Sequence, residues 1–454
     1  MDAKGCEWVI TFGSDYSLRY KPIDTTLSPD EVFSLIEKEN KYAFLLESTT
    51  GESRLAEYSF IGFDPKEIVS LNSEPLTELR SLINRKQDSS NGIRFAGGLV
   101  GYVSYEAVKY SYPSLEGNKD SAFPAMQFGL YEDGIVFDHK TGRVSYFTAG
   151  EDRYEEIERI LKQEADYRNV RADLLNTDPE KEQFMKMVEK AKEYIIDGDV
   201  LQVVLSKRYN IRFKGDLIDF YFKLKRLNPS PYMYYLKFGE KVLTGSSPEM
   251  LIRVEGRNIE TFPIAGTAPR TGDEAKDKAL AKALLNNEKE LAEHVMLVDL
   301  ARNDIGRVAE YGTVSVPEYM SVHNFSHVQH IVTRVNGVLR KDCDAVDAFM
   351  SIFPAGTVSG APKERALEII NELEKQARGP YAGAVGYFGF NGNADFAIAI
   401  RTLIAKGNSA YVQAGAGIVA DSKPEEEWYE TERKAAALLK CLEGGELDEG
   451  AHSR

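Results

Sequence analysis

Residues 380–419 read PYAGAVGYFGFNGNADFAIAIRTLIAKGNSAYVQAGAGIV and contain the pattern from which the fold class can be argued. Three apolar runs, at 380–390, 396–404 and 410–419, follow one another with only short breaks between them. Short apolar runs bounded by Gly and Asn predict buried β-strands. No helical pattern separates these runs, so the order of elements is not a strict βαβ repeat.

The flanking sequence adds helices to these strands. Apolar residues recur at helical spacing on both sides of the stretch, and one more strand-like run precedes it. The helical patterns occupy 179–197, 274–303, 360–377 and 424–441, and the additional strand is expected at 231–238. This order favours an α+β fold, with helices packed outside the sheets, over a doubly wound parallel sheet.

The N-terminal part also begins with clear helix and strand signals. Ser28 to Glu31 combines an N-cap serine, a proline at the first helical position and a capping-box glutamate, so a helix should begin there. Residues 41–46 predict a buried strand, and strand-like runs follow at 95–105 and 134–147. The charge-dense segment 150–176 is predicted to be helical.

A second helix-capping signal at 177–180 lies where the charge-dense segment 150–176 ends and a region of alternating helical patterns and apolar strands begins. We place a domain boundary nearby, which divides the chain into residues 1–170 and 171–445. Residues 446–454 are expected to form a flexible C-terminal tail.

Composition excludes several classes of function. The 454 residues include 71 Asp plus Glu against 56 Lys plus Arg, a net charge of −15, which disfavours binding to nucleic acid or to anionic lipid. Cys6, Cys343 and Cys441 lie far apart in no metal-ligand spacing, as is typical of a reducing compartment. No apolar run is long enough to span a membrane, so the expected location is the cytoplasm.

Two pairs of glutamates could carry metal chemistry. Glu290 and Glu293 are three positions apart, as are Glu427 and Glu430, and in a helix this spacing places both carboxylates on one face. Oxygen ligands without cysteine suit Mg²⁺. The alternative is that both pairs belong to solvated acidic helix surfaces.

Arg401 and His330 lie in apolar surroundings. A guanidinium inside the run 396–404 requires an anionic partner, which could be a core carboxylate or the carboxylate of a substrate. The glycines within 413–417 either let backbone N–H groups approach a ligand or form a bulge. His330 could be a buried core histidine or an acid or base. The residues alone leave these alternatives open.

Eight ordered motifs resemble those of the chorismate-utilising enzymes, and most closely those of component I of the anthranilate synthases. The motifs are Leu45–Ser48, Leu201–Ser206, Gly245–Glu249, Pro263–Thr267, Glu293–Asp304, Gly356–Lys363, Gly383–Phe388 and Val412–Glu430. The resemblance implies two intertwined subdomains of mainly antiparallel β-sheets packed face to face, with helices outside. It also implies that residues 1–170 regulate activity by binding tryptophan and that residues 171–445 bind chorismate.

The activity that the resemblance implies is a carbon–oxygen lyase reaction. Chorismate and ammonia would yield anthranilate and pyruvate, the first committed step of tryptophan biosynthesis, with Mg²⁺ as cofactor and tryptophan as feedback inhibitor. The chain has no glutaminase segment, so ammonia would come from a separate glutamine amidotransferase subunit, component II, in a heterotetramer with two copies of each subunit.

The resemblance also assigns roles to residues of this chain. It implies Mg²⁺ ligands at Glu290, Glu293, Glu427 and Glu430, of which Glu293 and Glu430 would bind directly. It implies substrate binding by Tyr387, Arg401, Gly266, Thr267, Gly415, Ala416 and Gly417. It implies catalytic positions at His330, Glu249, Thr357, Gln202 and Ala265, with Glu249 as the acid and His330 assisting the loss of pyruvate. It implies a tryptophan site at Glu47, Ser48, Pro231, Tyr232 and Met233.

Two positions distinguish this branch from its sister activities. Isochorismate-forming relatives carry lysine where this chain has Gln202, because water needs a base whereas ammonia is already a nucleophile. Aminodeoxychorismate synthases usually carry lysine where this chain has Ala265.

One departure from the family pattern is Ala268, where the family usually has arginine. Aminodeoxychorismate synthase and an amino-acid-binding regulatory module without catalysis are the alternative functions.

Overall fold

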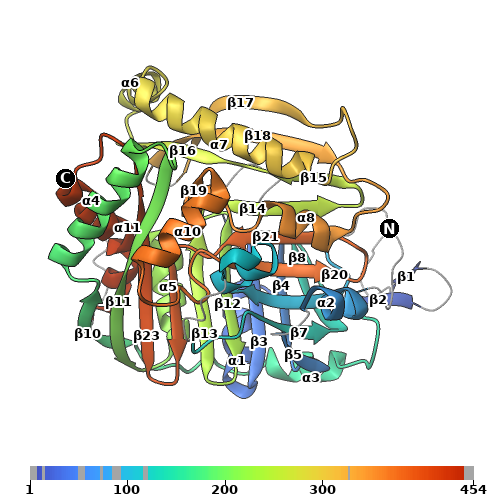
Figure 1. Ribbon diagram of the computed structural model, residues 1–454. Helices are drawn as coiled ribbons and strands as arrows, with labels where there is room; N and C mark the ends of the chain where they lie inside the picture. Colours follow the sequence, from blue (N-terminus) through green and yellow to red (C-terminus); the bar gives the residue numbers. More distant parts are fainter. Residues whose placement is uncertain are drawn as a thin grey trace.

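The computed structural model describes residues 8–12, 16–49, 57–71, 75–83, 94–115, 121–325 and 328–443. These residues form two antiparallel sheets whose strands run across one another in Figure 1, with helices around them. The predicted α+β class with helices outside the sheets is therefore confirmed. The predicted tail at 446–454 and Cys6 lie outside the described residues.

The larger sheet has 13 strands among the described residues. Its strands in spatial order are β1 (Trp8–Phe12), β2 (Tyr16–Pro22), β9 (Arg143–Thr148), β8 (Asp133–Asp138), β4 (Tyr58–Phe63), β3 (Tyr42–Glu47), β12 (Tyr232–Phe238), β13 (Lys241–Ser247), β22 (Thr402–Lys406), β23 (Ser409–Ile418), β11 (Gln202–Lys214) and β10 (Arg171–Asp178), with β19 (Gly360–Ala361) paired to β11.

The smaller sheet has 10 strands in the described part of the chain. Their order is β16 (Ile264–Pro269), β18 (Val328–Val338), β15 (Asn258–Thr261), β14 (Met250–Glu255), β21 (Ala394–Ile398), β20 (Ala384–Gly389), β6 (Gly98–Val103), β7 (Met126–Tyr131) and β5 (Glu67–Leu71), with β17 (Ser315–Asn324) paired to β18.

Helices cover the outer surfaces of the sheets. They are α1 (Pro29–Glu39), α2 (Pro75–Ile83), α3 (Tyr154–Ile160), α4 (Lys181–Ile196), α5 (Leu217–Leu227), α6 (Glu274–Leu284), α7 (Glu288–Gly306), α8 (Ala345–Ile352), α9 (Gly356–Ser359), α10 (Lys363–Leu373) and α11 (Pro424–Leu442), with short 3₁₀ turns at Tyr105–Tyr110 and Pro113–Leu115. None of the helices in the described ranges is long and apolar enough to cross a membrane. The cytoplasmic location stays a prediction.

Both sheets combine strands from the two halves of the chain. In the larger sheet β3 pairs with β12, and in the smaller sheet β6 pairs with β20. The proposed boundary at residue 170 falls in the connection between α3 and β10. A cut at this point would divide the strands of both sheets between the two halves, so neither sheet belongs to one half alone.

The main hydrophobic core lies between the two sheets. Phe44 on β3 packs edge-on against Tyr131 on β7, with 4.7 Å between the ring centroids. Phe60 on β4 likewise approaches Tyr387 on β20 at 6.1 Å. A second core, beneath α1, α5 and α11, covers the other face of the larger sheet. Because this sheet is buried on both faces, its strands are apolar without strict alternation.

Two expectations about local structure are wrong. The helix predicted over 150–176 ends at Ile160, and β10 begins at Arg171 because pairing with β11 overrides the local charge pattern. The strand predicted over 396–404 is two strands, β21 and β22, which belong to different sheets. The predicted helix start at Ser28 is confirmed, since the Glu31 carboxylate accepts a 2.7 Å hydrogen bond from the Ser28 backbone N–H.

A fully buried ion pair joins several of these elements. Arg378 donates to both carboxylate oxygens of Glu374, at 2.7 and 2.8 Å. Its guanidinium also donates to the carbonyl oxygens of Val358 and Val204, each at 2.8 Å. Arg378 therefore connects β11, the end of α9 and the segment after α10.

Replacing Arg378 with Met should lower the free energy of unfolding by about 3–5 kcal/mol, because the carboxylate of Glu374 would stay buried without its partner. Urea denaturation followed by circular dichroism measures this loss. Lys190→Met is a matched control, since it removes the exposed 2.7 Å ion pair with Glu193 and should cost at most about 1 kcal/mol. Equal effects of the two substitutions would contradict the prediction.

Candidate active site

The candidate active site begins where the chain crosses twice between the sheets. Residues after β13 cross to β14, and residues after β21 cross back to β22. The two crossings lie side by side, because the Ile398 N–H donates to the Glu249 carbonyl and the Ser246 N–H donates to the Arg401 carbonyl, at 3.0 and 3.1 Å. Each crossing therefore places one ionisable side chain, Glu249 or Arg401, between the sheets.

Arg401 is held in an unusual state. Its φ of 49° lies in the left-handed region, which non-glycine residues rarely adopt. The Arg401 guanidinium donates no hydrogen bond to any described residue. Burial lowers the pKa of Arg401, and the negative charge of the nearby Glu249 carboxylate opposes that decrease. A buried cation that lacks a close partner suits the binding of an anionic ligand.

Glu249 is a buried acid, with 7% of its surface exposed. Burial raises the pKa of its carboxyl to about 8, and the hydrogen bond from Thr357 and the positive charges of Arg401 and Lys434 oppose this rise. The Thr357 hydroxyl donates to Oε1 of Glu249 at 2.9 Å. The carboxyl group is therefore protonated at neutral pH and can act as an acid.

His330 on β18 is positioned by its backbone neighbours on β16. Its Nδ1 lies 2.8 Å from the Gly266 carbonyl oxygen, so Nδ1 carries the proton and Nε2 is an acceptor. The hydroxyl of Thr267 is 3.1 Å from the same nitrogen. Burial lowers the pKa of His330 to about 4, and the positive charge of Arg401 lowers it further. The imidazole is therefore neutral at pH 7.

The glycines of β23 allow two polar side chains to lie directly on that strand. A Cβ atom on Gly417 would be 2.6 Å from Nε2 of Gln202, and one on Gly415 would be 2.7 Å from the Tyr381 hydroxyl. Lys434 donates to the Gly415 carbonyl at 2.9 Å. The absence of side chains at Gly415 and Gly417 therefore lets polar groups approach the backbone of this strand closely.

The four glutamates lie near the N-terminal ends of two helices, α7 and α11. Burial raises the pKa of Glu290, and the negative charges of Glu293 and Glu430 add to this rise. Glu293 on α7 accepts a 2.9 Å hydrogen bond from Gln202, and Glu430 on α11 forms a 2.8 Å ion pair with Lys434. Burial also raises the pKa of Glu427, with Glu430 contributing. The like charges of α7 and α11 therefore converge on one region.

This arrangement fits a cation that keeps water or substrate ligands. Among the described residues, no group of three or more His, Cys, Asp or Glu side chains is close enough to hold a metal ion. A cage made of all four carboxylates is therefore excluded for this conformation. Mg²⁺ is usually bound by only one or two protein carboxylates, with waters and an anionic substrate completing its shell, so glutamates on two helices are compatible with such an ion.

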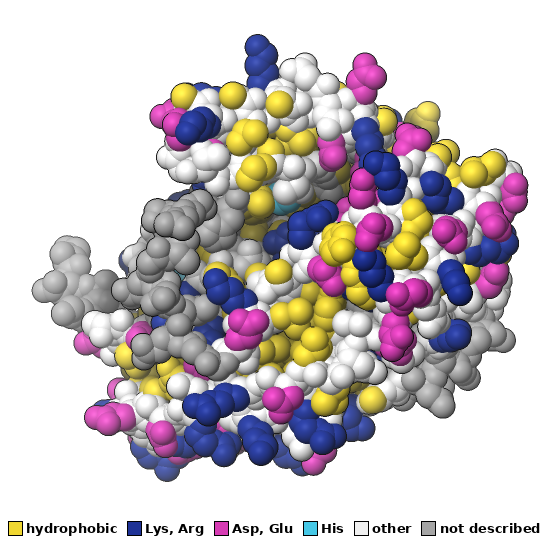
Figure 2. Space-filling view, turned by 90° about the vertical axis from the view of Figure 1, so that its left-hand side faces the viewer, with side chains coloured by type: hydrophobic (Ala, Val, Ile, Leu, Met, Phe, Trp, Pro, Cys, Tyr) yellow, Lys and Arg dark blue, Asp and Glu magenta, His cyan; other side chains and the backbone are white. Residues whose placement is uncertain are grey.

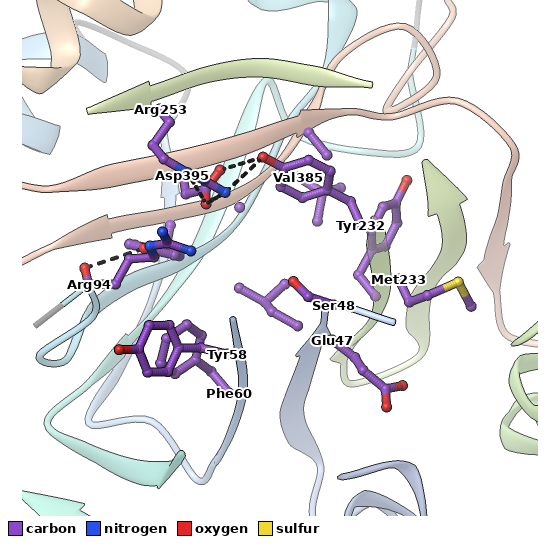
Figure 3. Close-up of a pocket in the computed structure, with 15 residues that line it drawn as sticks. Glu47, Ser48, Tyr58, Phe60, Arg94, Tyr232, Met233, Arg253, Val385 and Asp395 are labelled. Atoms are coloured by element: carbon purple, nitrogen blue, oxygen red, sulfur yellow. Dashed lines mark hydrogen bonds and ion pairs between the residues drawn. The ribbon is translucent and has the colours of Figure 1, made fainter. Parts of the chain in front are cut away.

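A second cavity lies between the sheets (Figure 3). Ser48, Tyr232 and Met233 line it, whereas Pro231 does not. Glu47 borders the cavity, but its carboxylate points away from it in Figure 3 and accepts hydrogen bonds from Tyr221 at 2.6 Å and Lys225 at 2.8 Å.

Charged residues of the smaller sheet complete the wall of this cavity. Arg253 forms a 2.8 Å ion pair with Asp395, and the Tyr232 hydroxyl donates to the same carboxylate at 3.0 Å. Arg94 also lines the cavity. Because its walls combine arginines, a carboxylate and aromatic rings, the cavity suits a zwitterion with an apolar side chain.

Comparison with known proteins shows the family. A family model described as chorismate binding enzyme matches residues 41–440. The chain is 50% identical over 437 residues to "Anthranilate synthase component 1" from Methanothermobacter marburgensis, with 91% of this chain and 93% of the relative covered. It is 41% identical over 465 residues to the Bacillus subtilis protein of that name, with 92% and 90% covered.

A solved structure agrees with these relatives. The crystal structure of anthranilate synthase component I from Streptococcus pneumoniae TIGR4 matches with a TM-score of 0.76 at 37% identity, covering 86% of this chain and 94% of that chain. The chain belongs to the family of chorismate binding enzymes. The predicted resemblance and the prediction of an enzyme are thereby confirmed, and membership of this family is consistent with metal dependence.

In this chorismate binding enzyme, most of the predicted site residues lie close together. His330 contacts Gly266 and Thr267, whereas Glu249 contacts Thr357 and lies near Arg401. Gln202 connects Gly417 with Glu293. Ala265 precedes Gly266 on β16 and pairs with Ile331, next to His330. Figure 2 shows a hollow on the side of the molecule where α4 and α11 lie, with apolar and basic side chains along it.

Tyr387 does not join this group. Its ring packs against Phe60 and Phe95, its hydroxyl donates to the Arg94 carbonyl at 3.3 Å, and it lines the second cavity. Tyr381 lies on Gly415 instead. The two tyrosines belong to one apolar run, and only the start of β20 at Ala384 separates them. Sequence reasoning therefore had no signal for choosing between them.

Sequence reasoning also missed Lys434. Its amino group contacts both the Glu430 carboxylate and the Gly415 carbonyl, so it connects the acidic helix to the glycine strand. A signal for this residue was present, because Glu430 and Lys434 are four positions apart in a predicted helix.

The Thr357 hydrogen bond can be tested without substrate. We expect the Glu249 carboxyl of the free enzyme to titrate near pH 8, and Thr357→Val to raise that pKa further because the carboxylate loses a hydrogen bond. Carbon-13 NMR of glutamate-labelled protein measures the titration, and the signal that Glu249→Gln removes identifies Glu249. A pKa near 4.5 in the unaltered chain would contradict the prediction.

Proposed function

We propose that this chain is component I of an anthranilate synthase, which converts chorismate and ammonia to anthranilate and pyruvate. The observation that carries the proposal is Gln202, whose amide donates to Glu293 beside Gly417. An amide cannot deprotonate water, whereas ammonia attacks without a base. This favours amination over formation of isochorismate. Ala265 offers no amine for covalent attack at C2, so it favours direct amination over the aminodeoxychorismate synthase alternative.

The proposed cofactor is Mg²⁺ between α7 and α11. Glu293 and Glu430 would bind it directly, with Glu290 and Glu427 acting through water, and the ion would supply charge stabilisation to a substrate carboxylate. Gln202 and Lys434 hold the two direct carboxylates in place. The raised pKa of Glu290 supports the proposal, because a cation would relieve the repulsion that raises it.

Substrate binding would use the unpaired guanidinium of Arg401. Chorismate is a dianion, so one carboxylate can bind the metal while Arg401 neutralises the other. Tyr381, in place of Tyr387, would contact the substrate beside Gly415. Backbone groups of Gly266, Gly415, Ala416 and Gly417, together with the Thr267 hydroxyl, would complete the site.

Glu249 would act as the acid in the first step. Ammonia attacks C2, the double bonds shift, and the C4 hydroxyl leaves as water after taking the proton of the Glu249 carboxyl. Thr357 orients this carboxyl, and the positive charges of Arg401 and Lys434 stabilise the carboxylate that remains. A carboxyl with a pKa of about 8 supports this role, because it still carries its proton at pH 7.

His330 would act in the second step. Its free Nε2 can take the proton from C2 while the bond between C3 and the enolpyruvyl oxygen breaks, which releases pyruvate and makes the ring aromatic. In the absence of substrate, burial and Arg401 keep the pKa of His330 low. An anionic substrate paired with Arg401 would remove part of that effect and make the imidazole a stronger base.

The product of the reaction tests this proposal. With chorismate, ammonium and Mg²⁺, the isolated chain should release anthranilate and pyruvate in equal amounts, as measured by chromatography. Chelation should abolish turnover, and Glu430→Gln should lower kcat/KM by about 10- to 100-fold at limiting Mg²⁺ because it removes a ligand charge. Isochorismate or aminodeoxychorismate as the main product would refute the assignment.

The name component 1 of the relatives implies a partner component. We propose that the partner is a glutamine amidotransferase, component II, which supplies ammonia in a heterotetramer with two copies of each subunit. Tryptophan, as feedback inhibitor, would occupy the cavity between the sheets. Tyr232 and Met233 offer aromatic and apolar surface to the indole, and the Ser48 hydroxyl and the charged wall suit the amino acid group.

The position of Glu47 changes how this site would work. Its carboxylate is bound by Tyr221 and Lys225, so Glu47 anchors β3 instead of contacting the ligand's ammonium group. Asp395 also lines the cavity, where its carboxylate pairs with Arg253 and accepts a hydrogen bond from Tyr232. Inhibition requires that tryptophan bind an inactive conformation of the enzyme more tightly than the active one. Strand β21 would link the two sites, because it carries Asp395 and leads directly to the crossing at Arg401. The alternative is a permanently bound, structural tryptophan.

Ser48→Phe should fill part of this cavity. We expect activity without tryptophan to stay within about twofold, and the tryptophan concentration for half-inhibition to rise by tenfold or more, which corresponds to about 1.4 kcal/mol of lost linkage. Assays over a range of tryptophan concentrations measure the shift. If Ser48→Phe has normal basal activity and unchanged inhibition by tryptophan, this cavity is not the inhibitory site. If the purified chain keeps bound tryptophan after dialysis without denaturant, the structural alternative is favoured.

A further inference from the structure

Lys207 is a buried lysine that the proposed reaction does not use. It lies on β11 with 0% of its surface exposed, and its Nζ forms no hydrogen bond within the described part of the chain. The nearest carboxylate oxygen, Oε1 of Glu432, is 3.6 Å away. Burial lowers the pKa of Lys207 to about 8, and Glu432 opposes this shift. The amino group is therefore charged at pH 7 without the hydrogen bonds that a buried ammonium normally makes.

An aromatic ring takes the place of those hydrogen bonds. The Nζ atom of Lys207 lies 3.0 Å from the ring centroid of Trp428 and 5.2 Å from that of Tyr209. Trp428 packs in turn against Phe184 of α4, with 5.8 Å between the ring centroids. This is a cation–π interaction, which is stronger when the cation is removed from water.

This contact acts on the helix that carries two of the proposed metal ligands. Trp428 and Glu432 are four positions apart on α11, so they share the face that meets Lys207 on β11. Glu427 and Glu430 lie on other sides of the same helix. Because each residue turns the helix by about 100°, Glu427 points about 100° to one side of Trp428 and Glu430 about 200° to the other. A rotation of α11 that broke the Lys207 contact would therefore turn both carboxylates.

We propose that Lys207 is a positioning residue that sets the rotation of α11 through Trp428 and so fixes the direction in which Glu427 and Glu430 face the metal. This inference rests on the proposed metal site. Lys207 does not contact the metal or the substrate, and its effect is on metal affinity through the helix.

The experiment measures binding of Mn²⁺ alone to the full chain, by electron paramagnetic resonance, and then activity as a function of Mn²⁺. Lys207→Met keeps the length and apolar stem of the side chain but removes the charge. We expect its Kd for Mn²⁺ to rise by about tenfold, the lower end of the range for residues that orient metal ligands. At saturating Mn²⁺, kcat should return to within about twofold of the unaltered chain.

Two further substitutions control for general effects. Lys207→Arg should keep the Kd within about twofold, because a guanidinium also stacks on an indole ring. Lys190→Met, which removes an exposed lysine, should leave the Kd unchanged.

The outcomes separate this inference from the proposed function. If the unaltered chain binds no Mn²⁺, the proposed metal site fails, and the positioning role fails with it. If it binds Mn²⁺ and Lys207→Met has the same Kd, only the positioning role is overturned. If Lys207→Met does not fold by circular dichroism, Trp428→Leu is measured instead. It should weaken Mn²⁺ binding by a similar factor, and an unchanged Kd would overturn the proposal.

Discussion

The site depends on a pair of adjacent crossings between two sheets. The chain passes from the larger to the smaller sheet after β13 and from the smaller to the larger sheet after β21, and backbone hydrogen bonds at Glu249 and Arg401 hold these two crossings together. Because both crossings lie in the interior, each places one ionisable side chain away from water. The left-handed backbone of Arg401 is strain of the kind that proteins keep at functional sites.

Burial gives the two side chains complementary states. It raises the pKa of Glu249, so the carboxyl keeps its proton, and it lowers the pKa of Arg401, whose guanidinium has no hydrogen-bonding partner among the described residues. A neutral acid beside a cation would suit the proposed substrate, which is an anion that must lose a hydroxyl group. The folded carboxyl keeps its proton at pH values where the unfolded one, with an ordinary pKa of 4.5, has lost it, so the free energy of unfolding should fall as the pH rises from about 4.5 to about 8 and level off above that.

The same architecture connects the second cavity to this site. Both sheets line that cavity, and β21 contributes Asp395 to its wall before the chain reaches Arg401. A ligand that changed the spacing of the sheets there would act on the crossing only a few residues away. The cavity and the crossing at Arg401 are therefore built from strands of the same two sheets.

Sequence patterns alone predicted the class of elements, the helix start at Ser28, the buried strands around 380–419 and the family. Ordered motifs also predicted site roles for Glu249, Arg401, His330 and the four glutamates, because motifs depend on residue type and local spacing. Only the tertiary structure decided that 396–404 is split between two sheets, that Tyr381 instead of Tyr387 lies on Gly415, and that Glu47 is bound by Lys225. Local periodicity cannot specify these features, because strand pairing and contacts between distant segments decide which sheet and which neighbour each residue has.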